Sequence, residues 1–536
     1  MKNIFKSILA LVCCGAFLVS CEQEVPETEM SVDLTSISAA AQNPEEVAVT
    51  LTTNASWLLV CPDWITPSQT YGVGDAILTF TIATNYKDEK TSTRARSGEI
   101  KISGGGALTG KGATIVVTVN QDGYTYVDPN PSLGGIPDAE EFAAFIVAAN
   151  TGGSLKRWTS DEANEVRLLA DIDLTGVEVD WQAIADASKA SNANNASLVV
   201  EGVTPFEGVF NGDNHKITGF NPVVVLGNNT TFGLFAIAHN ATIKNVELSG
   251  TFNVSATGIA DAGMLVGTAI NSTITNVKIG GKVVSAGSTA TSRISLAGVC
   301  GYAYAGIINE GVYGATLIEG CTVDAVAEFD GGSNVGNGAG GSMYGGICGF
   351  ATTPKADAAH KVTIKNCVNN GDMIVKVGRC SGIIATANAG TILEDVTNYG
   401  DQVNTVPNGR LGNIACNVAA YCTLKNCVNY GNLEATASGY SGTCAGIFAL
   451  TGDATITGIE GLENYGTIKT LSSAGKYVGL LWANHNKTLP TKNCIASGRI
   501  IIDGVEKEIN EINYMDFLGA TTNKDCLSNI LWSAPK

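Results

Sequence analysis

A short apolar pattern, led by Gly or in one copy by Asn, recurs along the C-terminal part of the chain. Its eight copies are Gly233–Ala236, Gly263–Val266, Gly298–Gly301, Gly346–Gly349, Gly382–Ala385, Asn413–Cys416, Gly446–Ala449 and Gly479–Trp482. None has an i, i+3, i+4, i+7 stripe long enough for a helix, so the pattern predicts short strands.

A second pattern follows several of these copies, most clearly at Thr363–Gly371 and Thr423–Gly431. Its closing glycine recurs at positions 371, 400, 431, 466 and 498, and an earlier pair closes at 250 and 281. A period of about 30 residues indicates stacked repeats. Two or three strands with their turns fit that length, which predicts a right-handed parallel β-helix whose strands pair with their copies in neighbouring coils.

Stacking of like positions predicts three ladders. An inward aliphatic ladder is expected from Ile364, Ile392, Leu424 and Ile456. A turn ladder with amides bonded along the stack is expected from Asn245, Asn276, Asn366, Asn426 and Asn493. Four cysteines share a position occupied by Val246, Val277 and Val396 in other copies, which indicates buried thiols rather than metal ligands: Cys321, Cys367, Cys427 and Cys494.

Residues 31–125 show strand alternation broken by turns, typical of a β-sandwich, and residues 126–136 are a Pro- and Gly-rich linker. Asn54–Trp57, Pro62–Ile65, Asn85, Arg96–Ile100 and Val119–Gln121 resemble the BACON module, an immunoglobulin-like domain of gut-bacterial surface proteins. The resemblance implies carbohydrate binding or a spacer role. Trp57 and Trp64 are expected in the sandwich core, with stacking on a sugar as the alternative.

Residues 1–21 have the basic start and short apolar centre of an export signal, and the run Leu18–Cys21 resembles a bacterial lipobox. The resemblance implies lipidation at Cys21, an outer-membrane lipoprotein exposed at the cell surface, and a membrane contact through the lipid alone. An ordinary signal peptide is the alternative. Residues 22–30 are expected to be a tether.

Residues 137–229 are expected to cap the β-helix. A helix is predicted from Asp138, with Phe142, Phe145 and Ile146 on its apolar face and Gly152 at its end, plugging the open end of the column. Phe206–Asn221 resembles the first segment of GLUG-repeat β-helix proteins, and the resemblance extends over the repeats of residues 230–498. Residues 499–536 are expected to close the other end, with a hairpin turn at Asp503 and Gly504.

The net charge of −18 disfavours nucleic acid and anionic lipid as direct partners. No zinc spacing occurs among the 15 cysteines, and neither metal nor cofactor is expected. Free thiols in an exported protein suggest an anaerobic habitat, although disulfides between coils are the alternative.

Some β-helices are polysaccharide lyases or hydrolases, so acidic pairs are candidate catalytic groups. Asp171 with Asp173 is interpreted as structural, and Glu394 with Asp395 as charge pairing with Lys365 and Lys425 along the column. No catalytic residue is predicted, and the chain is expected not to be an enzyme.

The candidate binding residues are Tyr399, Tyr430 and Tyr465, which share one position on three consecutive coils, together with Asn398, Asn429 and Asn464. A row of tyrosines about 5 Å apart could hold an extended glycan, with the asparagines adding amide contacts. A ladder that only packs on itself is the alternative.

The leading functional prediction is non-catalytic binding of an extracellular polysaccharide or host glycan, with surface transporters as neighbours. The second is an adhesin or structural surface protein that binds a protein or host matrix, and the third is a polysaccharide lyase or hydrolase.

Overall fold

The structure, a computed structural model, describes residues 27–87, 91–105, 111–125, 132–160, 163–179, 181, 184–185, 197–198, 205–286, 293–308, 314–331, 341–353, 361–419, 421–437, 442–451, 456–471, 477–485, 491–521, 527 and 529–535. The chain divides into two compact units, residues 1–131 and 132–536. The predicted all-β class is confirmed, with a β-sandwich in the first unit and a parallel β-helix of about eight coils in the second.

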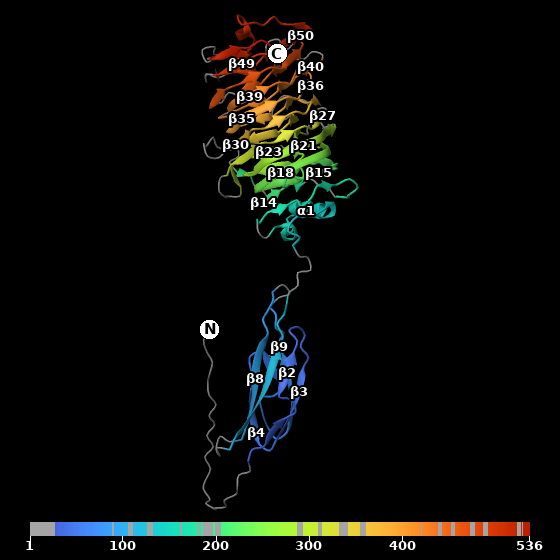
Figure 1. Cartoon of the computed structure of the whole chain (residues 1–536), viewed down its shortest axis with the longest axis vertical. Helices are drawn as coiled ribbons and strands as arrows, with labels where there is room; N and C mark the ends of the chain where they lie inside the picture. The colour runs from blue at the N-terminus through green and yellow to red at the C-terminus, as the bar shows by residue number, and fades with distance from the viewer. Residues whose placement is uncertain are drawn as a thin grey trace, which may run out of the picture. The chain divides into compact units, whose positions relative to one another are not determined.

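The sandwich has two sheets (Figure 1). The first contains, in spatial order, β1 (Met30–Val32), β3 (Val47–Thr53), β7 (Ala76–Ile82) and β5 (Ile65–Pro67), all antiparallel. The second contains β2 (Ser36–Ala39), β9 (Ala113–Gln121), β8 (Arg96–Gly104), β4 (Ser56–Val60) and β6 (Tyr71–Val73), antiparallel except between β2 and β9. Buried and exposed residues alternate along the longer strands, so one face of each sheet forms the core around Leu51, Phe80 and Ile100.

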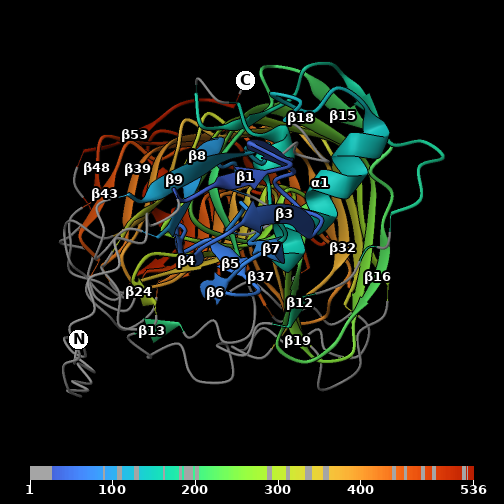
Figure 2. The ribbon, with the colours of Figure 1, turned by 90° about the horizontal axis from the view of Figure 1, so that it is seen from below.

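Helix α1 (Ala139–Thr151) covers the first coil of the column, as predicted (Figures 1 and 2). Asp138 caps it by accepting a hydrogen bond from the Glu141 amide, and Gly152 ends it in a left-handed conformation. Phe145 stacks on Phe210 with ring centroids 5.6 Å apart. Asn150 also donates to the Leu234 carbonyl and accepts from the Ala236 amide. The helix therefore covers the apolar core and also satisfies backbone groups of the first coil.

The rest of the cap precedes the first full coil. Its elements are the 3₁₀ turn Lys156–Trp158 and the strands β10 (Val166–Arg167), β11 (Ile172–Asp173), β12 (Ile184–Ala185), β13 (Ser197–Leu198), β14 (Phe206–Asn211), β15 (Lys216–Thr218) and β16 (Val223–Leu226). Strand β13 pairs with β24 (Ile307–Ile308), which belongs to the third coil.

Eight coils follow, and each strand pairs in parallel with its copy in the next coil. The first two coils are β17 (Thr230–Phe232) with β18 (Phe235–Ala256), and β19 (Ile259–Gly263), β20 (Val266–Ile270) and β21 (Thr273–Ala286). The third is β22 (Arg293–Ala297), β23 (Cys300–Tyr304), β24, β25 (Thr316–Glu319), β26 (Thr322–Val323) and β27 (Val326–Asp330). The fourth is β28 (Met343–Gly345), β29 (Cys348–Thr352), β30 (Val362–Lys365), β31 (Val368–Asn369) and β32 (Met373–Lys376).

The later coils repeat this order of strands. The fifth is β33 (Arg379–Ser381), β34 (Ile384–Ala387), β35 (Thr391–Asn398) and β36 (Gln402–Asn404), and the sixth is β37 (Arg410–Gly412), β38 (Ala415–Val418), β39 (Thr423–Asn429) and β40 (Leu433–Ala435). The seventh is β41 (Thr443–Ala445), β42 (Phe448–Thr451), β43 (Gly458–Glu460), β44 (Glu463–Asn464) and β45 (Thr467–Thr470). The eighth is β46 (Val478–Gly479), β47 (Trp482–His485), β48 (Thr491–Lys492), β49 (Cys494–Ala496) and β50 (Arg499–Ile502).

The predicted C-terminal hairpin is present. Strand β50 pairs antiparallel with β51 (Val505–Glu506), and the turn residues Asp503 and Gly504 both have positive φ. A 3₁₀ turn (Tyr514–Phe517), β52 (Ala520–Thr521) and β53 (Ile530–Trp532) follow, and the two strands extend the parallel stack.

The aliphatic ladder exists, but two of its predicted members were wrong. The register aligns Ile364 with Leu393, Leu424 and Ile459, all buried. Ile392 is only partly buried and lies one position out of register, and Ile456, although buried, precedes the ladder position by three residues. Loop lengths differ between coils, so spacing alone did not fix the register.

The turn ladder is confirmed. The five predicted asparagines all have φ between 52° and 56°, and Asp395, Gly320 and Gly461 supply the same left-handed turn in other coils. Asn276 donates to Asn245 and Asn426 donates to Asp395, both at 2.8 Å.

The described cysteines are all free thiols, and ten of the eleven are buried. Cys427 aligns with Val396 in the adjacent strand, which confirms its interpretation as a small core residue. Burial raises the pKa of Cys416 to about 12 and that of Cys422 to about 11, so these thiols stay protonated and unreactive.

Candidate functional site

The three predicted tyrosines form one continuous stack on the outside of the column. The ring centroids of Tyr399 and Tyr430 lie 4.9 Å apart and those of Tyr430 and Tyr465 lie 5.1 Å apart, with interplanar angles of 5° and 12°. Tyr399 is 52% exposed and Tyr430 41% exposed. Parallel pairing of β35, β39 and β44 sets this spacing, because each coil places its tyrosine directly beside the previous one.

Stacking determines which atoms the row can offer to a ligand. Both faces of the Tyr430 ring are covered by its neighbours, so a sugar cannot lie flat on that ring. What remains is a file of ring edges and hydroxyl groups, one per coil, running along the column. The spacing is comparable with the length of one sugar residue in an extended chain.

Glu463 belongs to this row, although the sequence patterns did not single it out. The Tyr465 hydroxyl donates to Glu463 Oε2 at 2.9 Å. Burial and this bond raise the pKa of Tyr465 to about 12, and burial together with the charges of Tyr399 and Glu463 raises the pKa of Tyr430. The signal was present in the sequence, because residues two apart in a strand share a face.

The asparagines do not face a ligand, contrary to the prediction. Asn398, Asn429 and Asn464 are fully buried. Asn398 donates to Asn429 Oδ1 at 2.9 Å, Asn429 donates to Asn464 Oδ1 at 2.8 Å, and each also bonds to the carbonyl of the glycine two residues later. These side-chain amides form hydrogen bonds with one another inside the column, so their role is structural.

The acidic pairs have structural partners. Asp171 accepts from the Lys216 amide and His215, and Asp173 accepts from the Thr175 amide, bonds that lower the pKa of both carboxyls. Two ionised carboxylates lack the raised pKa of a glycosidase acid.

Glu394 lies in a charge row that alternates along six coils: Glu319, Lys365, Glu394, Lys425, Glu460 and Lys492. Lys425 Nζ lies 2.8 Å from Glu394 Oε1, in agreement with the charge-pairing interpretation. Lys365, however, pairs with Glu319, at 3.1 Å.

Neither tryptophan of the sandwich presents a fully exposed ring face on which a sugar could stack. Trp57 is buried and donates to the Gly74 carbonyl, as expected of a core residue. Trp64 is partly buried, and the Arg96 guanidinium lies 4.4 Å from the centroid of its ring.

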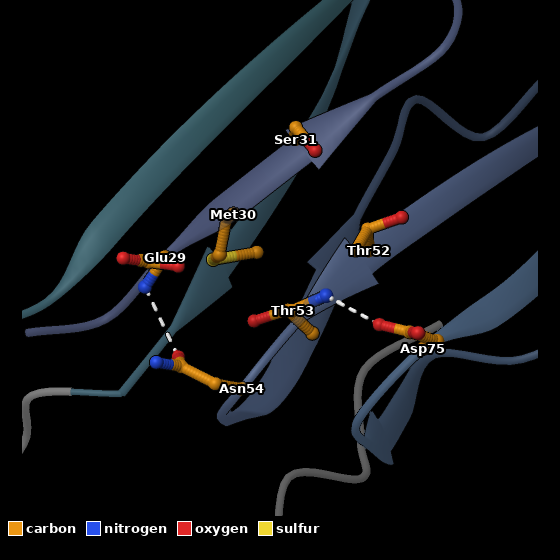
Figure 3. Close-up of a pocket in the computed structure, with 7 residues that line it drawn as sticks. All are labelled: Glu29, Met30, Ser31, Thr52, Thr53, Asn54 and Asp75. Atoms are coloured by element: carbon orange, nitrogen blue, oxygen red, sulfur yellow. Dashed lines mark hydrogen bonds between the residues drawn. The ribbon is translucent and has the colours of Figure 1, made fainter. Parts of the chain in front are cut away.

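A cavity of about 500 Å³ lies beside strands β1 and β3 of the sandwich (Figure 3). Two of its polar side chains serve backbone amides: Asp75 accepts from the Thr53 amide and Asn54 from the Glu29 amide. None of its seven lining residues has an aromatic ring that could contact a sugar.

Cys21 and most of the Gly-rich stretch Gly331–Ser342 lie outside the described residues. Within the described part of the chain, no three His, Cys, Asp or Glu side chains are grouped as metal ligands would be. In that same part, no helix has both the length and the apolar character needed to cross a bilayer.

Residues 48–122 match the BACON family model, described as "Putative binding domain, N-terminal". This match covers most of the sandwich. It confirms the predicted resemblance of this segment to the BACON module. No curated protein sequence matches the chain.

Three solved structures are similar to parts of the chain. A Bacteroides ovatus protein described as a "putative immunoglobulin A1 protease" is 18% identical, with a TM-score of 0.38 over 61% of this chain and 85% of its own. A Bacteroides ovatus GH5 xyloglucanase bound to a heptasaccharide is 13% identical, with a TM-score of 0.15 over 36% of each chain. A protein described as IgA1 protease is 12% identical, with a TM-score of 0.36 over 84% of this chain and 26% of its own.

Proposed function

We propose that this protein is a lipid-anchored outer-membrane protein, exposed at the cell surface, that binds glycan without catalysis, as its resemblance to BACON and GLUG-repeat surface proteins implies. The observation that carries the binding proposal is the exposed tyrosine stack, with phenolic edges and hydroxyls repeated at 4.9 and 5.1 Å. Successive weak contacts along a rigid column add up when one polymer spans several coils.

The family match of residues 48–122 also supports a binding role. BACON is described as a binding domain, and it precedes the column in this chain. In the proposed arrangement Cys21 carries the lipid and residues 22–30 form the tether. The partner is an extracellular polysaccharide or host glycan, and a surface transporter then takes up the products of its degradation.

The test is affinity electrophoresis of residues 22–536 against a panel of soluble polysaccharides. Replacing Tyr399, Tyr430 and Tyr465 together by Ala is expected to weaken binding by about tenfold or more, since each lost hydrogen bond contributes roughly 0.5–1.5 kcal/mol. Tyr421→Ala is the matched control, because Tyr421 is 43% exposed on the same column but outside the stack. Equal binding by the triple variant and the parent would overturn the tyrosine site.

One observation favours the alternative, an adhesin with a protein partner. Leu58 and Val60 on β4, with Tyr71 and Val73 on β6, are between 56% and 83% exposed. Leu58 pairs directly with Tyr71, so these side chains form one apolar surface on the outer face of the sheet. Such a patch is typical of protein contacts. Absence of glycan binding across the panel would favour this function, and release of reducing sugar or unsaturated product would favour the third, a hydrolase or lyase.

A further inference from the structure

Three carboxylates at or near the tyrosine row have no lysine or arginine partner among the described residues. Several outward carboxylates elsewhere on the column pair with lysines of a neighbouring coil, as Glu394 does with Lys425 and Glu434 with Lys469, at 2.8 and 2.7 Å. Among the described residues, Asp372, Asp401 and Glu463 form no ion pair. The row therefore keeps a negative charge.

These three acids are held in place by hydrogen bonds to neutral groups. Asp372 accepts from the Asp401 amide at 2.9 Å, and Asp401 accepts from the amide and side chain of Asn432 at 2.7 and 3.0 Å. Glu463 precedes Tyr465 by two residues and accepts a hydrogen bond from its hydroxyl, which places this acid beside the stack. Asp401 lies two residues after Tyr399, across the corner at Gly400, and its amide donates to Asp372 of the adjacent coil.

We propose that the row selects uncharged glycans and that Glu463 is one of its ligand-binding residues; this rests on the proposed glycan-binding function. Glu463 Oε2 accepts the hydrogen bond that the Tyr465 hydroxyl donates, so Oε1 and the phenolic oxygen are left as adjacent acceptors. Neighbouring hydroxyls of a sugar ring can donate to that pair, and hydrogen bonds to a carboxylate are stronger than those to a neutral acceptor.

The same charges disfavour an acidic polysaccharide. A chain lying along the stack would pass Glu463 and, at the Tyr399 end, the corner that carries Asp401 next to Asp372. Carboxylate or sulfate groups on that chain would be repelled by these like charges. We therefore expect about tenfold weaker binding for an anionic polymer than for its neutral counterpart at low ionic strength. The difference should shrink in 1 M salt, where the screening length falls to about 3 Å.

The test compares hydroxyethyl cellulose with carboxymethyl cellulose, and hydroxyethyl starch with carboxymethyl starch, on residues 22–536. Asp401→Asn with Glu463→Gln keeps the hydrogen-bond acceptors but removes two charges, and should raise binding of the carboxymethyl polymers severalfold. Glu463→Gln alone should weaken binding of the neutral polymers severalfold. Glu434→Gln, which removes a carboxylate paired with Lys469, is the matched control and should change neither.

The outcomes separate the two proposals. Equal binding of neutral and carboxymethyl polymers, still lost in the tyrosine triple variant, would overturn charge selection and leave glycan binding standing. Unchanged neutral-polymer binding in Glu463→Gln would remove Glu463 from the site. If no polymer of either kind bound, both the proposed function and this inference would fail.

Discussion

At the residue scale, direction within a strand decides which side chains can act. Asn429 and Tyr430 are consecutive, so they point to opposite sides: the amide enters the column and the ring faces solvent. Alternation alone could have predicted that the asparagines point inward, and that Glu463 lies on the same face as Tyr465. The stacking of the rings, in contrast, required the register of three coils, which no single strand contains.

Tyr465 should ionise at unusually high pH. Burial and its bond to Glu463 raise its pKa from an ordinary 10 to about 12. Because the folded state favours the protonated phenol, the stability that this group contributes is present below pH 10 and is lost as the pH rises towards 12. Ultraviolet difference absorbance of tyrosinate, compared with Tyr465→Phe, measures the pKa. Glu463→Gln should lower it, and an unchanged value would contradict the role of the carboxylate charge.

At the scale of the strand and turn, the sequence predicted the coil and part of the register. The left-handed turn residue is the reliable marker, because counting back two positions from Asn366, Asp395, Asn426 or Gly461 reaches the true ladder residue in every coil. Asp395 and Gly461 replace the asparagine in two coils. For that reason, aligning asparagines and apolar residues by spacing alone misplaced two members of the ladder.

The closing glycines are predicted to be irreplaceable for steric reasons. A Cβ on Gly400 would lie 2.0 Å from the Gly371 carbonyl oxygen. The backbone of the adjacent coil is held by packing and cannot shift far enough to relieve this clash. We expect Gly400→Ala to lower the free energy of unfolding by about 3 kcal/mol, measured by urea denaturation. Gly458→Ala is the matched control, since its Cβ would lie 3.5 Å from Thr423 Cγ2; its effect should stay within about 0.5 kcal/mol. Equal losses in the two variants would contradict the steric argument.

At the scale of the whole molecule, the sandwich and the column bury the apolar faces of their β-strands in different ways. The sandwich closes two antiparallel sheets around one core, whereas the column repeats one coil and needs a cap at its open end. Sequence patterns were sufficient for both architectures. They could not supply the charge state of the tyrosine row, because this depends on which acids find a lysine in the adjacent coil.

The buried thiols provide a test of the column as a continuous core. Ten described cysteines are buried within it, and burial raises the pKa of Cys494, near its C-terminal end, to about 11. In residues 22–536 carrying Cys61→Ser and Cys526→Ser, only those ten thiols remain. A thiol reagent at pH 8 should label none of them quickly in the native protein and all ten in denaturant, because both access and thiolate formation require opening of the coils. Rapid native labelling of several thiols, followed by mass spectrometry, would show coils that open independently and would contradict a column closed along its whole length.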